Sequence, residues 1–339
     1  MIDFTKPHRR RNPLIGEWVL VSPHRAKRPW QGSIEPTQPA QAPEYMEDCY
    51  LCPHNTRSNG EKNPDYTKTF AFTNDHASLL PDALGDSPED TDLLYAVQER
   101  GLCRVICYSP KHNTTMADLS VDEIKEIVLT WKNEYETIGK MDQISYVQIF
   151  ENKGPLMGAS SPHPHGQIWA NEHLPTIVQK EQQHQLAYNR EHSSPLLLAY
   201  VQRELEKQER LVIENEAFAV VVPFWATWPY ETMVLPKRHI RSLSDMRSTE
   251  HTQLADILKR LTSRYDKLFS TPFPYSMGIH QKPTDREEHP EWQFHMHFYP
   301  PLLRSSTIKK YYVGYEMMAE GQRDISPESA AKTLQEIHD

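Results

Sequence analysis

The residues with the clearest chemical potential lie in SSPHPHGQIW, residues 160–169, where two histidines and a glutamine occupy every second position. Side chains at i, i+2 and i+4 of a β-strand share one face, so we expect His163, His165 and Gln167 to project together. Imidazole groups can bind a metal ion, act as nucleophiles or move protons. The alternative is a polar strand with hydrogen-bonded histidines, and Pro162 and Pro164 favour an edge or irregular strand.

A second motif, CYLC, contains Cys49 and Cys52. A Cys-x2-Cys pair offers two thiolates on one turn, as structural zinc sites require, and zinc then needs two further ligands. Redox chemistry is the competing use of this spacing. The candidate partners, which spacing alone leaves open, are His54, His76, His112 and His163.

Composition limits the class of protein. A chain of 339 residues predicts about two domains, and its net charge of −9 argues against nucleic-acid or membrane-surface binding. No apolar run approaches the roughly 18 residues of a membrane helix, and the basic N-terminus lacks the apolar region of a signal peptide. Four cysteines are too few for a disulfide framework, so Cys103 and Cys107 are interpreted as core residues. We therefore predict a cytoplasmic protein with no nucleic-acid or membrane partner.

The elements that must position these motifs occur in one order, twice. Strands are predicted at residues 17–22, 103–108 and 144–150, then within 219–236 and at 275–279. One helix follows the capping box of Ser120 and Glu123, and a second follows a cap at Ser248. Each half reads strand, PKH or PKRH, helix, strand, loop and His-x-His. This order predicts two fused copies of one α+β unit, residues 1–175 and 211–339, joined by helical segments at 176–210.

Seven longer motifs carry a family resemblance. They are FTND (72–75), FENKG (150–154), SSPHPHGQIWA (160–170), WPYE (228–231), SRYD (263–266), QFHMHFYPPLLRS (293–305) and VGYEM (313–317). These motifs are collinear from about residue 8 to the C-terminus, and the sequence resembles the class I galactose-1-phosphate uridylyltransferases of the histidine-triad superfamily. The resemblance implies a duplicated histidine-triad-like α+β unit, with an antiparallel half-barrel sheet and flanking helices.

The resemblance also implies a reaction. UDP-glucose and galactose 1-phosphate would exchange a uridylyl group, giving glucose 1-phosphate and UDP-galactose, by a ping-pong mechanism through a covalent uridylyl-His165. Neutral imidazole is a ready nitrogen nucleophile near pH 7. Gln167, which would face the phosphoryl group, can donate hydrogen bonds without exchanging protons. Hydrolases of the superfamily carry a third histidine at that position, so the HPHGQ pattern favours transfer over hydrolysis.

Two metal sites are implied by the same resemblance. The zinc ligands would be Cys49, Cys52, His112 and His163. A second site, for structural iron or zinc, would use Glu181, His280, His295 and His297. Glu172 is a rival for Glu181, and hydrogen-bonded strand histidines are the alternative interpretation of His295 and His297. Because Tyr299 stands where the first half has Gln167, no second active site is expected.

The substrate contacts are carried over by position, and together they imply a homodimer with shared active sites. Arg25 and Arg28 would bind phosphate, since arginine suits bidentate phosphate contacts, although a solvated charge run is the alternative. Asn74 and Asp75 would bind the uridine and its ribose. The phosphate loop would comprise Asn152, Gly158, Ala159 and Ser160. The hexose and its phosphate would contact residues that this family takes from the partner subunit, here Lys310, Tyr311, Tyr315, Glu316 and Gln322.

Two rival function classes remain open. A nucleotidyl hydrolase or a nucleoside-diphosphosugar phosphorylase could use the same nucleophile, and product analysis would identify either one. A non-catalytic zinc protein would lose its metal without losing any sugar-nucleotide binding.

Overall fold

A computed structural model describes residues 2–27, 42–82 and 93–338 of the chain. The strands are β1 (His8–Arg11), β2 (Trp18–Val21), β3 (Phe70–Thr73), β4 (Gly101–Cys107), β5 (Tyr146–Lys153), β6 (His165–Asn171), β7 (Leu211–Glu214), β8 (Phe218–Val221), β9 (Thr232–Pro236), β10 (Tyr275–His280), β11 (His295–Tyr299), β12 (Leu302–Ser305), β13 (Ile308–Lys309) and β14 (Gly321–Arg323). The helices in these ranges are α1 (Val121–Ile138), α2 (Thr176–His192), α3 (Leu196–Lys207), α4 (Ser248–Leu268), α5 (Tyr315–Met318) and α6 (Pro327–Gln335). The α+β class predicted from the sequence is confirmed.

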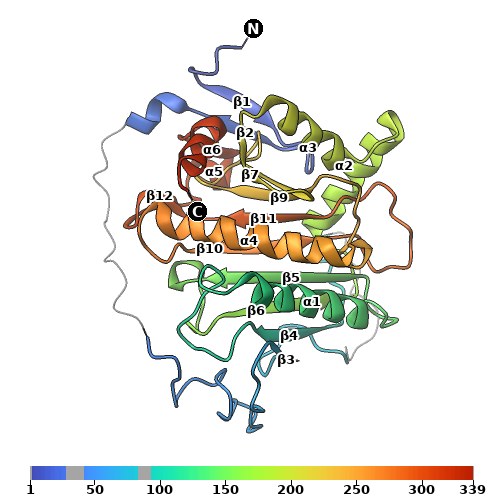
Figure 1. Ribbon diagram of the computed structural model, residues 1–339. Coiled ribbons are helices and arrows are strands. Elements are labelled where there is room, and N and C mark those ends of the chain that lie inside the picture. Colours follow the sequence, from blue (N-terminus) through green and yellow to red (C-terminus); the bar gives the residue numbers. More distant parts are fainter. Residues whose placement is uncertain (1, 28–41, 83–92, 339) are drawn as a thin grey trace.

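One antiparallel sheet of nine strands organises the molecule (Figure 1). Its order is β3-β4-β6-β5-β10-β11-β9-β8-β7, and β5 pairs with β10 at the centre. Outward from this central pair the strands are β6, β4 and β3 on one side and β11, β9, β8 and β7 on the other. Corresponding strands of the two halves therefore take corresponding places in the sheet. In the first half the chain runs β4, α1, β5, β6, and in the second half β9, α4, β10, β11. The repeated order of elements in the sequence therefore corresponds to two similar halves of a single sheet.

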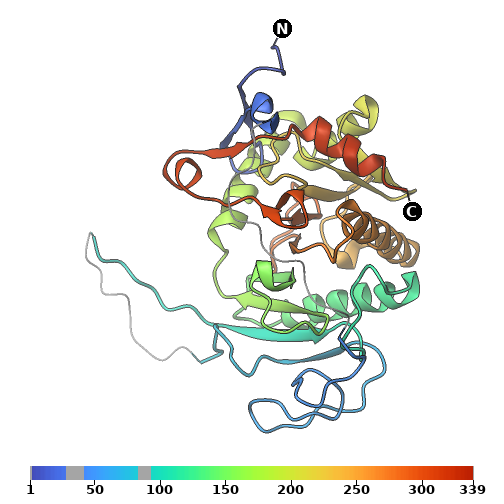
Figure 2. The same cartoon turned by 90° about the vertical axis from the view of Figure 1, so that its left-hand side faces the viewer.

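Helices α1 and α4 pack side by side on one face of this sheet (Figure 2). Ser120 and Glu123 form the predicted capping box of α1, and its apolar stripe, which includes Ile127 and Trp131, is buried. The facing sheet residues, among them Ile168 and Ile279, belong to the same core cluster. Burial on this face fixes the register, because a shift by one residue would turn every side chain to the opposite face.

On the opposite face of the sheet, chain segments cover both ends, and Glu181 of α2 contacts His280, His295 and His297 on the central strands β10 and β11. Helix α3 packs on β8 and β9 at one end through residues such as Leu197 and Val201. The chain segment that contains Cys49 and Cys52 packs at the other end, against β3 and β4. Between these coverings the central strands carry His165, Gln167 and the second His-x-His, so these predicted site residues share one face.

Two expectations about local structure are corrected. The strand that carries His165 is not an edge strand, because β6 pairs with β4 on one side and β5 on the other. Pro162 and Pro164 do not interrupt the hydrogen bonds between these strands, because β6 begins at His165, one residue after Pro164. Helix α4 begins at Ser248 itself, and the residue at its N-cap is Arg247, whose N–H donates to Glu250. Across the described residues, no helix combines the length and apolarity needed to cross a membrane.

Candidate active site and metal clusters

The first cluster of metal-ligand side chains joins three distant segments. Its members are Cys49, Cys52, His112 and His163. One donor atom from each lies within 4.8 Å of the others, and all four residues are buried. His54 is exposed and pairs with Asp65, and His76 is exposed after β3, so neither of these two candidates joins the thiols.

The spacing inside this cluster matches a tetrahedral cation. Cys52 Sγ lies 3.7 Å from His112 Nδ1 and 3.5 Å from His163 Nδ1. Zinc–sulfur and zinc–nitrogen bonds at the tetrahedral angle place sulfur and nitrogen about 3.6 Å apart. Burial raises the pKa of the Cys52 thiol to about 11 and lowers that of His163 to about 4. A bound cation would lower the pKa of Cys52 again, because it stabilises the thiolate.

Neighbouring groups orient His163. Its Nε2–H donates to the carbonyl of Ser109 at 2.9 Å, which leaves Nδ1 with a lone pair facing Cys52. The hydroxyl of Tyr66 lies 3.1 Å from the same Nε2 and donates to the carbonyl of Leu51, the residue just before Cys52. Such outer contacts fix the tautomer and ring orientation of metal-binding histidines. Tyr66 was missed in the sequence because its contact with His163 spans distant segments.

His165 stands next to this cluster with one ring nitrogen engaged and the other available. Its Nδ1–H donates to the carbonyl of His163 at 2.7 Å, so the lone pair resides on Nε2. The side chain is half-buried, on the face opposite α1. Burial lowers the pKa of His165, which favours the neutral, nucleophilic imidazole.

Gly166, which separates His165 from Gln167, makes room for a neighbouring ring. A Cβ at this position would lie 2.1 Å from the hydroxyl of Tyr108 and 3.1 Å from the carbonyl oxygen of Phe150. Tyr108 is itself buried and packs edge-on against Trp131. A glycine inside a strand is a known sign of such close approach, and this signal was present in the sequence.

The second cluster lies on the same face of the sheet, on β10, β11 and α2. It comprises Glu181, His280, His295 and His297, with donor atoms within 4.8 Å of one another. The Glu181 carboxylate lies 2.8 Å from His280 Nδ1, whereas its rival Glu172 pairs with Arg100. Burial alone would raise the pKa of Glu181, but His280 and His295 hold it well below its usual range.

Two histidines of the second cluster have ring nitrogens that make no hydrogen bond among the described residues but face Glu181, whose carboxylate lies 3.5 Å from His295 Nε2 and 3.8 Å from His297 Nε2. His295 Nδ1 hydrogen-bonds the carbonyl of Gln293 at 2.8 Å, while its Nε2 is buried without a hydrogen bond among the described residues. In that same part of the chain neither ring nitrogen of His297 has a hydrogen-bond partner, and burial lowers its pKa to about 3. Three imidazoles and one carboxylate form a donor set that suits iron or zinc.

Comparison with known proteins decides the family. The family model "Galactose-1-phosphate uridyl transferase, N-terminal domain" matches residues 2–175, and the corresponding C-terminal model matches residues 181–339. The chain belongs to the galactose-1-phosphate uridylyltransferase family. A galactose-1-phosphate uridylyltransferase from Haemophilus influenzae is 50% identical, over 98% of this chain and 95% of the relative. One from Rattus norvegicus is 47% identical, over 98% of this chain and 88% of the relative.

Solved structures agree with this membership. A structure of a uridylyltransferase is 28% identical, covers 97% of each chain and has a TM-score of 0.75. An ADP-glucose phosphorylase from Arabidopsis thaliana, 23% identical, covers 98% of this chain and 99% of its own, and its TM-score of 0.77 shows that it shares the fold.

The residues that the uridylyltransferase resemblance assigns to uridine and phosphate come from the end of β3, from β5 and from the loop between β5 and β6. Asn74 and Asp75 follow β3, and the Asp75 carboxylate accepts hydrogen bonds from Arg57 and Ser58. Asn152 lies on β5, and its side-chain oxygen accepts a hydrogen bond from the Ser276 hydroxyl at 2.7 Å. The remaining loop residues, between β5 and β6, are Gly158, Ala159 and Ser160. Gly158 has a φ of +78°, a left-handed conformation that favours glycine.

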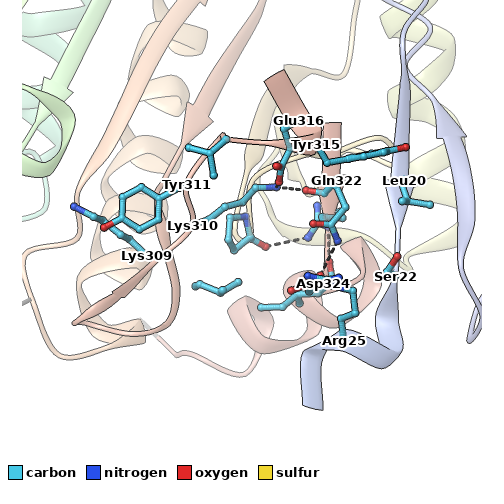
Figure 3. Close-up of a pocket in the computed structure, with 15 residues that line it drawn as sticks. Leu20, Ser22, Arg25, Lys309, Lys310, Tyr311, Tyr315, Glu316, Gln322 and Asp324 are labelled. Carbon is cyan, nitrogen blue, oxygen red and sulfur yellow. Dashed lines mark hydrogen bonds and ion pairs between the residues drawn. The ribbon is translucent and has the colours of Figure 1, made fainter. Parts of the chain in front are cut away.

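The remaining predicted substrate residues lie together, but elsewhere (Figure 3). One cavity of about 500 Å³ is lined by Arg25, Lys310, Tyr311, Tyr315, Glu316 and Gln322, among others. Lys310 Nζ hydrogen-bonds the carbonyls of Thr227 and Gln322, and burial lowers its pKa to about 8. Among the described residues, the cavity includes none from β5 or β6, and in Figure 1 the strands β9, β11, β10 and β5 lie between β2 and β6. Arg28 lies outside the described residues.

Proposed function

We propose that this protein transfers a uridylyl group between UDP-glucose and galactose 1-phosphate in the cytoplasm, through a covalent intermediate on His165. The reaction follows from membership of the galactose-1-phosphate uridylyltransferase family and from close relatives of that name. The observation that carries the mechanism is the single hydrogen bond from His165 Nδ1–H to the carbonyl of His163. It leaves Nε2 as the nucleophile, on the exposed side of a strand that is anchored on both edges.

The chemical step needs no proton transfer. Nε2 of His165 attacks the α-phosphorus of UDP-glucose, and the bond from that phosphorus to the glucose 1-phosphate oxygen breaks. The leaving group is a phosphate oxygen, which departs as an anion without a general acid. The imidazole becomes positively charged, and its Nδ1–H strengthens the hydrogen bond to the His163 carbonyl. Galactose 1-phosphate then attacks the same phosphorus and restores neutral His165, which predicts ping-pong kinetics and overall retention of configuration at phosphorus.

We assign structural roles to both metal clusters. Zinc held by Cys49, Cys52, His112 and His163 would have four protein ligands and no open position for substrate. Its effect on catalysis would be positional, because the carbonyl of His163 is the group that orients His165. Iron or zinc at the second cluster would tie α2 to β10 and β11 through Glu181.

A homodimer is part of this proposal. Arg25 and Lys310 belong to a cavity that contains no residue of β6 in the described chain, yet they carry the charge that suits a hexose phosphate. A second copy would bring this cavity to His165 and so complete each active site.

The decisive experiment uses UDP-glucose with no acceptor. The intact mass of the protein should rise by one uridylyl group as one equivalent of glucose 1-phosphate is released, and peptide mapping should place the group on His165. His165→Ala should abolish the modification, whereas His173→Ala, a change at an exposed histidine just beyond β6, should leave it unchanged. Modification of His163, His295 or His297 would contradict the assignment. Adding galactose 1-phosphate, inorganic phosphate or water alone then separates the transferase from a phosphorylase or a hydrolase.

A further inference from the structure

The carboxamide of Gln167 is held in one orientation by its neighbour on the strand. Nε1–H of Trp169 donates a hydrogen bond to Gln167 Oε1 at 3.2 Å. An indole N–H can only donate, whereas a carboxamide has one accepting and one donating end. The contact therefore selects the orientation in which Oε1 faces Trp169 and the Nε2 amine faces away from it.

The orientation of the Gln167 carboxamide decides whether a hydrogen-bond donor or an acceptor faces the transferring phosphoryl group. The two ends of a carboxamide are nearly equal in size, so packing alone distinguishes them poorly. If Gln167 turned by half a rotation, its oxygen would replace its amine beside the phosphoryl oxygens, and a stabilising donor would become a repelling acceptor. No other hydrogen bond holds the Gln167 carboxamide within the described part of the chain.

Trp169 is well placed to impose this orientation. It lies two residues after Gln167 on β6, so both side chains project from the same face of the strand. Its backbone position pairs with Cys103 on β4 and with Gln148 on β5, and its ring packs edge-on against Phe150, with the ring centroids 5.8 Å apart. The backbone of Trp169 is thus held by both neighbouring strands, and its ring packs against Phe150.

We propose that Trp169 is a positioning residue for uridylyl transfer, which acts by presenting the amine of Gln167 to the transferring phosphoryl group. This inference rests on the proposed uridylyl transfer and on the role that the family resemblance gives Gln167, which is to face the phosphoryl group. Trp169 itself does not contact the reacting atoms.

The test is a double-mutant cycle on the rate of UDP-glucose-dependent uridylylation. Trp169→Phe keeps an aromatic ring beside Phe150 and removes the N–H donor together with part of the indole volume. Loss of one hydrogen bond of ordinary strength should lower kcat about five- to tenfold, with the KM for UDP-glucose changed less than about twofold. Gln167→Ala should lower kcat about 10²-fold or more. In the Gln167→Ala background, Trp169→Phe should have almost no further effect, because no carboxamide remains to be oriented.

Controls separate orientation from general damage to the strand. Trp18→Phe removes an indole from an exposed position on β2 and should leave kcat unchanged. Additive losses from Trp169→Phe and Gln167→Ala, or an unchanged kcat in Trp169→Phe alone, would overturn the positioning role while leaving the proposed reaction intact. An unchanged kcat in Gln167→Ala would overturn the role of Gln167 and this inference with it.

A spectroscopic measurement covers the case in which Trp169→Phe folds poorly. The indole ¹⁵N–H resonance of Trp169 should shift in Gln167→Ala, because its acceptor is removed. An unchanged resonance would overturn the proposal.

Discussion

Gly166→Ala tests whether His165 and Gln167 depend on the space that glycine leaves between them. The new Cβ would lie 2.1 Å from the Tyr108 hydroxyl and 2.8 Å from the ring carbon that bears it. An ordinary carbon–oxygen contact is about 3.5 Å, so either the ring or the strand must move by more than about 1 Å. Tyr108 is buried and packs against Trp131, so it cannot swing into solvent.

The expected cost follows from this geometry. Overpacking of a buried site typically costs about 1–3 kcal/mol, and this contact belongs at the upper end. About 3 kcal/mol corresponds to a fall in Tm of about 4 °C for a chain of this length. Because Gly166 lies between His165 and Gln167, the two residues proposed to act on the phosphoryl group, a shift of about 1 Å in β6 should also lower kcat by up to about 10²-fold.

The assay combines thermal unfolding with the rate of uridylylation by UDP-glucose. Gly278→Ala is the matched control, because it lies on the interior strand β10 and its Cβ would meet only Gln148 Nε2 at 3.4 Å, an ordinary contact. Tyr108→Phe in the Gly166→Ala background removes the closest contact and should restore part of both losses. The rescue should be partial, since the ring carbon remains at 2.8 Å.

The reasoning is refuted if Gly166→Ala and Gly278→Ala have the same Tm and the same kcat. It is also refuted if Tyr108→Phe restores neither quantity. In either case the close approach of Tyr108 would not constrain the catalytic strand.

Two further predictions concern the metal cluster and the ion pairs of Glu328, a partly buried carboxylate, with two buried arginines. Cys52→Ser should lower the bound zinc, the Tm and kcat together. The control Cys103→Ala, which changes a buried thiol on β4 outside the cluster, should retain the metal. Full zinc content in Cys52→Ser would contradict the ligand assignment. Burial by itself raises the pKa of Glu328, but hydrogen bonds from Arg10 and Arg210 bring it down to about 2, below its usual 4.5. The ionised carboxylate therefore stabilises the fold above about pH 4.5, and this contribution is lost as the pH falls toward 2. Glu328→Gln should reduce the free energy of unfolding by about 2 kcal/mol at pH 7 and by less at pH 4, measured by denaturant titration; an equal loss at both values would exclude this explanation.

Much of the fold was predictable because its signals are local. The capping box of Ser120 and Glu123 is complete within four residues, and α1 begins directly after Ser120, as that motif predicts. The alternation in HGQIWAN predicts one polar and one buried face, and β6 has both. The repeated order of elements predicted two related units, although only the structure shows that β5 and β10 join them into one sheet.

The boundaries and partners were less predictable because they depend on distant contacts. Pro162 and Pro164 suggested an edge strand, yet β6 is interior, since the ladder starts after both residues. The prediction that Ser248 caps α4 was wrong by one position. The N-cap is Arg247, whose backbone N–H donates a hydrogen bond to the Glu250 carboxylate. Tyr66 left no sequence signal, since a hydroxyl that hydrogen-bonds a distant histidine looks like any other buried tyrosine.

The sequence by itself determined the chemical inventory: two thiols at zinc spacing, alternating imidazoles with a carboxamide, and a glycine inside a strand. These are properties of residue type and short-range spacing, and on β6 the alternation places His165 and Gln167 on one face. Only the tertiary structure decided which histidines meet the thiols, that Glu181 and not Glu172 meets His280, and that Arg25 and Lys310 lie away from His165 within one chain. Those outcomes depend on how strands far apart in sequence pair and on which faces helices bury, and no local pattern records such pairings.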